Sequence, residues 1–184
     1  MGGNDLQHEL QQAHRHIGWR GLQLTDAKAR FTRPDMAASF NGIAQGFAAD
    51  RVSTILAQHG FHDTLVDLGE FAARGAKSAT PWRLGIYNPL TQRTIAAIKP
   101  AGAIATSEPH GTLIGGQSHI VDPLKRPGER WTSVTVEAPE AWRADALSTA
   151  IAASPMQEAE SLLVAGGATR GWLINTSDVI EWHA

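Results

Sequence analysis

Asp145 and Thr149 lie four residues apart in the segment WRADALSTAI, residues 142–151. The small and apolar residues around them are typical of a packed helix, on which positions four apart share one face. Both side chains carry oxygen, the ligand atom that Mg²⁺ prefers, and Mg²⁺ often keeps positions open for substrate phosphates. Taken alone, however, the pair is more typical of a solvated face on which Asp145 pairs with Arg143 or another base.

A second candidate is the segment NGIAQG, residues 41–46, in which Gly42 and Gly46 bracket the start of a helix. Free backbone N–H groups at a helix N-terminus suit a phosphate or pyrophosphate when no side chain blocks the approach. An ordinary loop and helix start is the alternative, and the spacing alone does not decide between the two.

The third candidate is His119, which lies between two predicted turns and is followed by an apolar pair and Asp122. Of the eight histidines it is the one embedded beside apolar residues. A buried, hydrogen-bonded histidine is the commoner outcome for a single residue of this type. The neighbouring string TSEPHG, residues 106–111, is typical of a solvated loop.

Composition narrows the classes of function. The chain has 184 residues, 42% of them hydrophobic, which is enough for one domain with a sizeable core. The formal net charge is −2 and no basic run exceeds a pair, so binding of nucleic acid or a membrane surface has no support. The absence of cysteine excludes disulfides, a cysteine nucleophile and thiolate metal sites. We find no signal peptide and no apolar run of about 18 residues, so no transmembrane segment is predicted.

These residues must be positioned by helices and strands, and the pattern of those segments along the sequence predicts an α+β fold with a mostly antiparallel sheet and packed helices. The reason is that consecutive strand-like segments are joined by short turns rather than by helical crossovers. Strands are expected at 21–25, 29–33, 63–69, 82–87, 94–99, 102–107, 131–138, 171–176 and 179–183. Helices are expected at 5–16, 47–60 and 156–167, and in the segment after Pro139 that carries Asp145.

Several of these strings resemble, in order and spacing, the motifs of the ApbE family, the FAD:protein FMN transferases. The strings are SFNGIAQGFAAD (39–50), DLGE (67–70), PWRLGIYNP (81–89), ATSEPHG (105–111), HIVDP (119–123) and SVTVEAPEAWRADALSTA (133–150). The resemblance runs from about Ile17 to the C-terminus and is to the C-terminal portion of the family domain, with the N-terminal part absent. It implies a T-fold-like domain at 17–184, preceded by a polar helix or linker at 1–16.

Three positions depart from the family pattern. Ser39 stands where the family has aspartate, Gln45 where it has lysine, and Glu70 where it has the second glycine of the LGG turn. Loss of the lysine removes one cationic contact to a pyrophosphate.

The resemblance also implies a reaction: Mg²⁺-dependent transfer of FMN from FAD to a Thr or Ser hydroxyl of an acceptor flavoprotein, with release of AMP. By resemblance, the metal ligands are the Ala44 carbonyl and the side chains of Asp145 and Thr149. His119 matches a family histidine important for transfer, as an acid/base or in positioning the phosphate. Asp145 and His119 are thus the expected catalytic residues. The residues expected to contact FAD are Ser39, Gly42, Ile43, Gln45, Gly46, Thr106, Ser107 and Ile120.

Two other functions stay open. The same site could split FAD to FMN and AMP with water, or the chain could be a non-catalytic, degenerate flavin-binding module. The expected partner is an acceptor flavoprotein of a membrane redox complex, together with a second copy of the chain or a separate N-terminal half. The resemblance implies the periplasm, or the outer face of the cytoplasmic membrane, as the location.

Overall fold

The computed structural model describes residues 8–9, 12–13, 16–77 and 80–184. The chain divides into two compact units, Met1–Ser39 with Pro123–Lys125 and Phe40–Asp122 with Arg126–Ala184. The helix expected at 5–16 falls largely outside the described residues. No helix among the described residues is long and apolar enough to cross a membrane.

The first unit contains a short antiparallel hairpin. A 3₁₀ helix, η1 (Trp19–Gly21), leads into β1 (Leu22–Thr25), which pairs with β2 (Lys28–Phe31). The two strands confirm those expected at 21–25 and 29–33.

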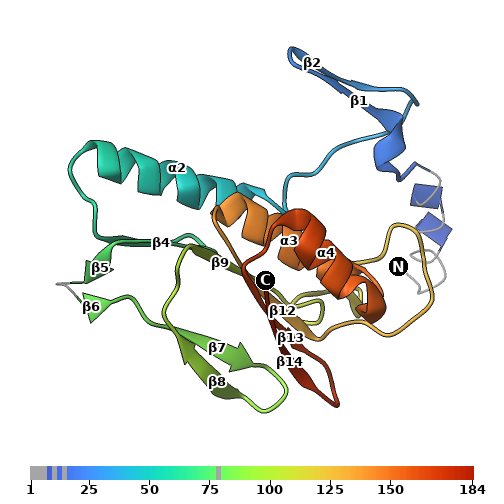
Figure 1. The fold of residues 1–184 in the computed structure, drawn as a ribbon. Helices are drawn as coiled ribbons and strands as arrows, with labels where there is room; N and C mark the ends of the chain where they lie inside the picture. Colours follow the sequence, from blue (N-terminus) through green and yellow to red (C-terminus); the bar gives the residue numbers. More distant parts are fainter. Residues whose placement is uncertain (1–7, 10–11, 14–15, 78–79) are drawn as a thin grey trace. The chain divides into compact units, whose positions relative to one another are not determined.

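The second unit is built on a six-stranded sheet in which every neighbouring pair is antiparallel (Figure 1). Short turns account for the pairs β3–β4 and β13–β14. The other three pairs are joined by longer segments, and the segment between β12 and β13 contains α3 and α4, so the expectation that short turns join the strands is wrong for these pairs. The strand order is β14 (Val179–His183), β13 (Arg170–Ile174), β12 (Ser133–Ala138), β9 (Ala103–Ser107), β4 (Phe71–Arg74) and β3 (Thr64–Asp67). Of these, β4 was not expected, and β3 is an edge strand in which only Val66 is buried.

Three two-stranded hairpins complete the strands of this unit. They are β5 (Ala76–Lys77) with β6 (Thr80–Pro81), β7 (Leu84–Asn88) with β8 (Arg93–Ile98), and β10 (Leu113–Ile114) with β11 (Gln117–Ser118). The pair β7–β8 confirms the strands expected at 82–87 and 94–99.

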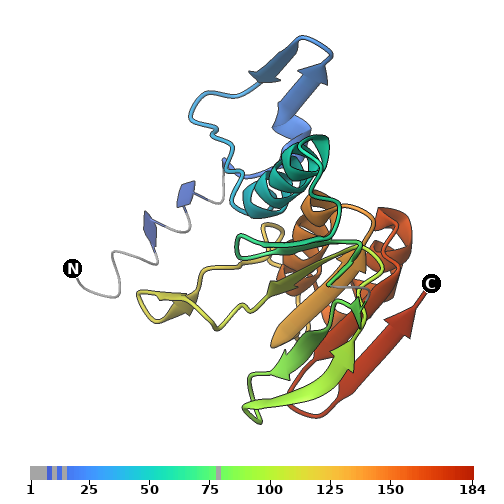
Figure 2. The same cartoon turned by 90° about the vertical axis from the view of Figure 1, so that its left-hand side faces the viewer.

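The helices α2 (Ala44–Gln58), α3 (Ala141–Ala153) and α4 (Ala159–Gly166) lie on one side of the sheet, and β7–β8 lies on the other (Figure 2). The expected helix at 156–167 is divided into a 3₁₀ turn, η2 (Met156–Glu158), and α4. It ends at Gly167, whose φ of +72° is the left-handed conformation that glycine adopts most easily.

The central strand β12 is buried along its whole length. Val134 and Val136 pack into the cluster beneath α3 and α4. Thr135, between them, lines a cavity under β7–β8. On this side of the sheet, Ile104 of β9 and Trp172 of β13 pack against Ile86 and Ile98 of the β7–β8 hairpin.

Candidate active site

Asp145 is buried in α3, with 3% of its surface exposed. Its Oδ2 accepts a hydrogen bond of 3.0 Å from the backbone N–H of Gly46 in the first turn of α2. Arg143 instead pairs with Glu140 at 2.7 Å and donates to the Gly166 carbonyl. The interpretation of Asp145 as the surface partner of Arg143 is therefore wrong, because α2 covers the face of α3 that carries Asp145.

Gly46 makes this close approach possible. A Cβ at this position would lie 2.3 Å from the carbonyl oxygen of Ala141, so no larger residue fits without moving one helix. One turn later, the Asp50 carboxylate accepts the backbone N–H groups of Ala141 and Trp142, each at 3.0 Å. Asp50 thus caps α3 from a neighbouring helix and holds the two helix starts together.

Three hydroxyl groups gather one turn further along α3. Ser107 Oγ at the end of β9 lies 2.8 Å from Ser148 Oγ and 3.2 Å from Thr149 Oγ1. A Cβ on Gly42 would lie 3.1 Å from the Thr149 side chain, so the segment before α2 also runs close to this residue. The fold therefore brings Gly42, Gly46, Ser107, Asp145 and Thr149 to the junction of α2, α3 and β9.

Glu70 is a second buried carboxyl group near this junction, and the sequence marked it only as a departure from the family pattern. It is 6% exposed, and its Oε2 accepts the backbone N–H of Thr106 at 3.1 Å. Burial, followed by the charge of Asp145, raises the pKa of Glu70 to about 8, with a smaller rise from Asp67 and an opposing effect of the Thr106 N–H. Glu70 is thus mostly neutral at pH 7. A glutamate at a position the family keeps for glycine was the signal that could have pointed to it.

The pKa of Asp145 is raised by burial, and the hydrogen bond from Gly46 opposes that rise. No lysine, arginine or histidine forms an ion pair with Asp145 within the described part of the chain. A buried carboxylate without a positive partner is costly, and a bound cation would remove that cost.

The start of α2 offers fewer free amides than the glycine-rich sequence suggested. The N–H groups of Ile43 and Ala44 donate to the Phe40 carbonyl, and that of Phe47 donates to Ile43. The Gly46 N–H is bound to Asp145. In the first turn of the helix, this leaves the N–H of Gln45 without a hydrogen-bond partner among the described residues. The expected cradle of free N–H groups is thus largely occupied by the protein itself.

Gln45 stands where the family has lysine, and its side chain lies against the β3–β4 turn. A Cβ on Gly69, whose φ is +98°, would meet Gln45 Nε2 at 2.6 Å. The amide of Gln45 therefore fills the space above a turn that requires glycine.

Thr106 and Ser107 face opposite sides of the sheet, because successive strand residues alternate. Ser107 points toward α3, whereas Thr106 Oγ1 lies 2.9 Å from Thr135 Oγ1 on the other side. There both threonines line a cavity of about 240 Å³ under β7–β8, together with Tyr87 and Glu108. Thr106 and Ser107, two of the residues expected to contact FAD, thus point to different sides of the sheet.

His119 follows the β10–β11 hairpin and is exposed, which differs from the buried histidine that its apolar neighbours suggested. Its Nδ1 lies 2.9 Å from the Thr112 carbonyl. Ile120 packs against the cluster beneath α3, and the Ser118 hydroxyl donates to the carbonyls of Pro109 and Ile120. The loop is thus held at its base while the imidazole faces solvent.

Ser39 and Ile43 complete the expected set. Ser39 belongs to the first unit, and Ile43 precedes α2 with 38% of its surface exposed.

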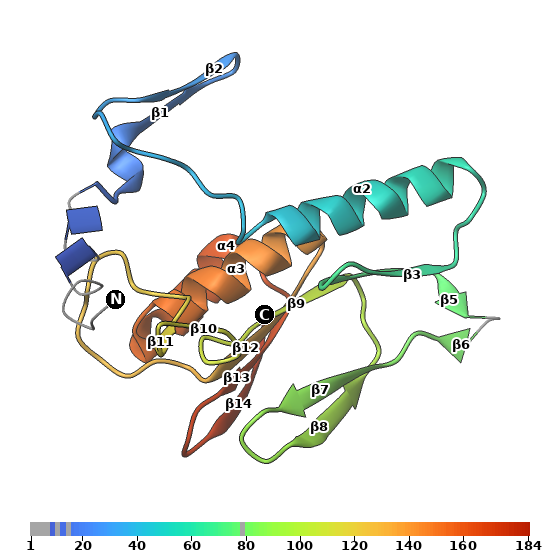
Figure 3. The same cartoon turned by 180° about the vertical axis from the view of Figure 1, so that it is seen from behind.

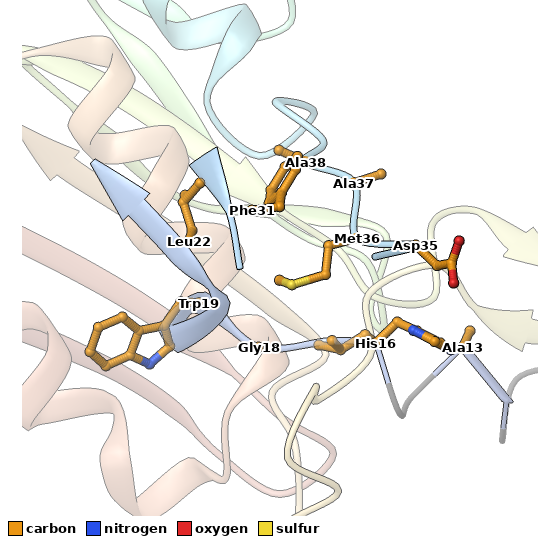
Figure 4. Close-up of a pocket in the computed structure, with 11 residues that line it drawn as sticks. Ala13, His16, Gly18, Trp19, Leu22, Phe31, Asp35, Met36, Ala37 and Ala38 are labelled. Atoms are coloured by element: carbon orange, nitrogen blue, oxygen red, sulfur yellow. The ribbon is translucent and has the colours of Figure 1, made fainter. Parts of the chain in front are cut away.

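The first unit has a cavity of its own of about 380 Å³, lined by Trp19, Phe31 and Met36 among others (Figure 4).

The residues at the junction fit a divalent cation of the oxygen-preferring kind. Within the described residues, no three His, Cys, Asp or Glu side chains are grouped to hold a metal. The ligands that the resemblance implies are the Asp145 carboxylate, the Thr149 hydroxyl and the carbonyl of Ala44, the first residue of α2, and all three offer oxygen. Such a sparse set suits Mg²⁺, which keeps several positions for water and phosphate oxygens.

The ApbE family model matches residues 3–169, and the chain belongs to the ApbE family. The FAD:protein FMN transferase of Salmonella typhimurium is 28% identical over 175 residues, covering 84% of this chain and 49% of that protein. The FAD:protein FMN transferase of Escherichia coli K12 is 30% identical over 134 residues, covering 64% of this chain and 37% of that protein.

Solved structures show the same fold. The flavin transferase ApbE from Vibrio cholerae has a TM-score of 0.78 and 26% identity, over 96% of this chain and 60% of that one. The ApbE protein from Thermotoga maritima has a TM-score of 0.79 and 25% identity, over 96% of this chain and 61% of that one. The chain spans about half the length of the Salmonella relative and about three fifths of these solved structures.

Proposed function

We propose that this chain carries the metal and pyrophosphate part of a flavin transferase site, and that it moves FMN from FAD to a Thr or Ser hydroxyl of an acceptor flavoprotein. The observation that carries the proposal is Asp145, a buried carboxylate held by the Gly46 N–H with no cationic partner among the described residues. Family membership and the names of the relatives support flavin transfer as the reaction.

In this reaction, the acceptor hydroxyl oxygen bonds to the phosphorus of the FMN half. The bond from that phosphorus to the oxygen shared with AMP breaks, the hydroxyl loses its proton, and AMP leaves with the shared oxygen. A bound Mg²⁺ neutralises charge on the phosphate oxygens. Asp145, Thr149 and the Ala44 carbonyl would hold it.

The remaining roles belong to side chains and amides around the junction. The free N–H of Gln45 at the start of α2 can donate to a phosphate oxygen. The exposed imidazole of His119 can accept the hydroxyl proton or position the phosphate, with its Nδ1 held at the Thr112 carbonyl. Ser107 orients the Thr149 hydroxyl through their 3.2 Å contact.

One observation favours a non-catalytic flavin-binding module as the second candidate. Gln45 lacks the charge that a lysine would bring to the pyrophosphate, and this loss weakens the positive field that phosphoryl transfer uses. Glu70, which is mostly neutral at pH 7, supplies no positive charge in its place.

The decisive experiment incubates the chain with FAD, Mg²⁺ and a flavin-acceptor domain, and follows covalent flavin by mass spectrometry and AMP by chromatography. Transfer predicts both products in equal amounts, whereas hydrolysis predicts AMP without an acceptor. A folded chain that binds FAD but releases no AMP would support the binding module. The periplasm remains the location that we propose, and fusion of the chain to a reporter of export tests it.

Asp145→Asn is the first variant to compare. The amide oxygen can still accept the Gly46 N–H, so the fold should persist, but the charge that holds Mg²⁺ is lost. We expect transfer to fall by on the order of a hundredfold or more, since metal stabilisation of the transition state amounts to several kcal/mol. Asp178→Asn, at an exposed turn, is the matched control and should keep full activity. Equal activity in both variants would contradict the metal assignment.

A further inference from the structure

Three hydroxyl groups link β9 to α3 beside the candidate metal site. The strand and the helix pack directly on each other (Figure 3). Ser107 Oγ lies 2.8 Å from Ser148 Oγ and 3.2 Å from Thr149 Oγ1. Ser148 Oγ in turn lies 3.0 Å from the backbone carbonyl oxygen of Asp145. Ser148 is 0% exposed and Ser107 is 9% exposed, so the contact between the two serines is shielded from bulk water.

The carbonyl oxygen sets the direction of these hydrogen bonds. A hydroxyl group has one proton to donate, whereas a carbonyl oxygen only accepts. Ser148 therefore donates to the Asp145 carbonyl, which uses its single proton. The proton between Ser107 and Ser148 must then come from Ser107, so the proton between Thr149 and Ser107 comes from Thr149. This is the one arrangement in which three protons serve all three contacts, and it forms a hydroxyl chain from Thr149 through Ser107 and Ser148 to the carbonyl.

The direction of the hydroxyl chain matters for Thr149, which is one of the proposed metal ligands. A hydroxyl oxygen binds a cation through its lone pairs, and a proton turned toward the cation opposes that binding. Here the Thr149 proton is held at Ser107, and the lone pairs of Thr149 Oγ1 stay available. We propose that Ser148 is a positioning residue for the cation site, because it accepts the Ser107 proton and thereby fixes the direction of the Thr149 hydroxyl. The inference rests on the proposed function, since it takes Thr149 as a ligand of Mg²⁺.

Loss of the Ser148 hydroxyl should reverse the contact at Thr149. Among the described residues, Thr149 is then the one remaining hydrogen-bond partner of the Ser107 hydroxyl. Ser107 would donate to Thr149 Oγ1 across the same contact, and the Thr149 proton would be free to turn toward the cation. Mg²⁺ should therefore bind more weakly although no ligand has been removed.

Titration of the chain with Mg²⁺ alone, followed by calorimetry, tests the proposal without FAD or an acceptor. We expect the dissociation constant to rise about tenfold in Ser148→Ala, as for the loss of one hydrogen bond to a charged group. In a Thr149→Ala background, adding Ser148→Ala should cause no further rise, because Ser148 acts through Thr149. Asp145 keeps that background able to bind at high Mg²⁺ concentration.

Ser161→Ala is the matched control. Ser161 also donates to the carbonyl three residues earlier in the chain, that of Glu158, but it lies exposed on α4. Its loss should leave the dissociation constant unchanged. If Ser148→Ala does not unfold cooperatively in EDTA, Ser107→Ala interrupts the same hydroxyl chain and should show the same dependence on Thr149.

Two results would overturn the positioning role. One is an equal loss of Mg²⁺ affinity with and without Thr149, which indicates a general disturbance of α3. The other is an unchanged affinity in Ser148→Ala when Asp145→Asn has lost it, which leaves the proposed metal site in place and rejects the hydroxyl chain alone. A wild-type chain that binds no Mg²⁺ would reject the metal site and the positioning role together.

Discussion

At the scale of single residues, the candidate site is defined by two buried carboxyl groups with different environments. Glu70 receives one backbone N–H, and its pKa of about 8 keeps it protonated at neutral pH. Asp145 receives the Gly46 N–H, and its pKa is raised by burial. Neutral Glu70 adds no negative charge beside Asp145, so the ionised form of Asp145 remains available to a cation.

Glu70 should make the protein less stable as the pH rises. In the unfolded chain its pKa is near 4.5, whereas in the folded protein it is about 8. Its contribution is therefore full below pH 4.5, falls as the unfolded state releases the proton, and is lost once the pH passes about 8. The side chain of Glu70→Gln stays neutral at every pH. In urea unfolding with EDTA present, the unfolding midpoint of this variant should therefore be higher than that of the wild type at pH 8, and the two midpoints should become equal at pH 4.5.

The control for this comparison is Glu160→Gln, since Glu160 is exposed on α4. Its pH profile should follow the wild type. Parallel profiles for wild type and Glu70→Gln would show that the folded pKa of Glu70 is not raised.

At the scale of elements, the site depends on the two helix starts of α2 and α3 lying against each other. Gly46 of α2 leaves room for the first turn of α3 to lie against it, and the Asp50 carboxylate of α2 accepts a backbone N–H of that turn. Neither residue touches the proposed metal ligands except through the Gly46 N–H. Loss of either should therefore disturb stability first.

Asp50→Ala removes the acceptor for the N–H groups of Ala141 and Trp142. Loss of a helix cap costs about 0.5–2 kcal/mol, so we expect a decrease of about 1–2 kcal/mol in the free energy of unfolding. Chemical denaturation measures it. Asp50→Asn, which keeps one acceptor oxygen, should recover part of the loss, and an unchanged midpoint in Asp50→Ala would contradict the capping role.

Gly46→Ala forces a methyl group toward the Ala141 carbonyl, which is backbone and cannot rotate away. Overpacking of this kind costs about 1–3 kcal/mol. Gly42→Ala is the useful comparison, because its new methyl meets the movable Thr149 side chain at 3.1 Å. We expect thermal unfolding to show a larger loss for Gly46→Ala, and Mg²⁺ binding to be weakened in Gly42→Ala despite near-normal stability.

At the scale of the whole molecule, folding and metal binding should be coupled through Asp145. The folded state presents a buried carboxylate without a positive partner in the described chain, and the unfolded state does not present the site at all. Mg²⁺ should therefore raise the melting temperature. The rise should be larger at pH 8 than at pH 5, because protons compete for a carboxylate whose pKa is raised.

Differential scanning fluorimetry with Mg²⁺ and with EDTA at both pH values checks this expectation. Asp145→Asn should remove the Mg²⁺-dependent rise and its pH dependence together. A rise that persists in Asp145→Asn would place the cation elsewhere.

Much of the fold could be predicted from local patterns. Strand alternation and the short turns between strands indicated antiparallel pairing, and the expected strands at 102–107 and 131–138 are β9 and β12. The strand β4 was missed because residues 71–74 lack a distinctive pattern and are stabilised by pairing with β3 and β9. The start of α2 was placed late, since its glycine-rich first turn is held by contacts with α3 rather than by helix propensity.

For the candidate site, the sequence by itself determined that Asp145 and Thr149 share a helix face, because helical periodicity alone requires it. The sequence also indicated the ApbE family through the order of its motifs, and the family model confirms this. Only the tertiary structure decided that this face is buried, that Glu70 lies near it, and that Ser107 meets α3 while Thr106 lines a cavity on the other side of the sheet. These outcomes depend on contacts between segments far apart in the chain, such as Gly46 with Asp145, and local sequence patterns do not encode them.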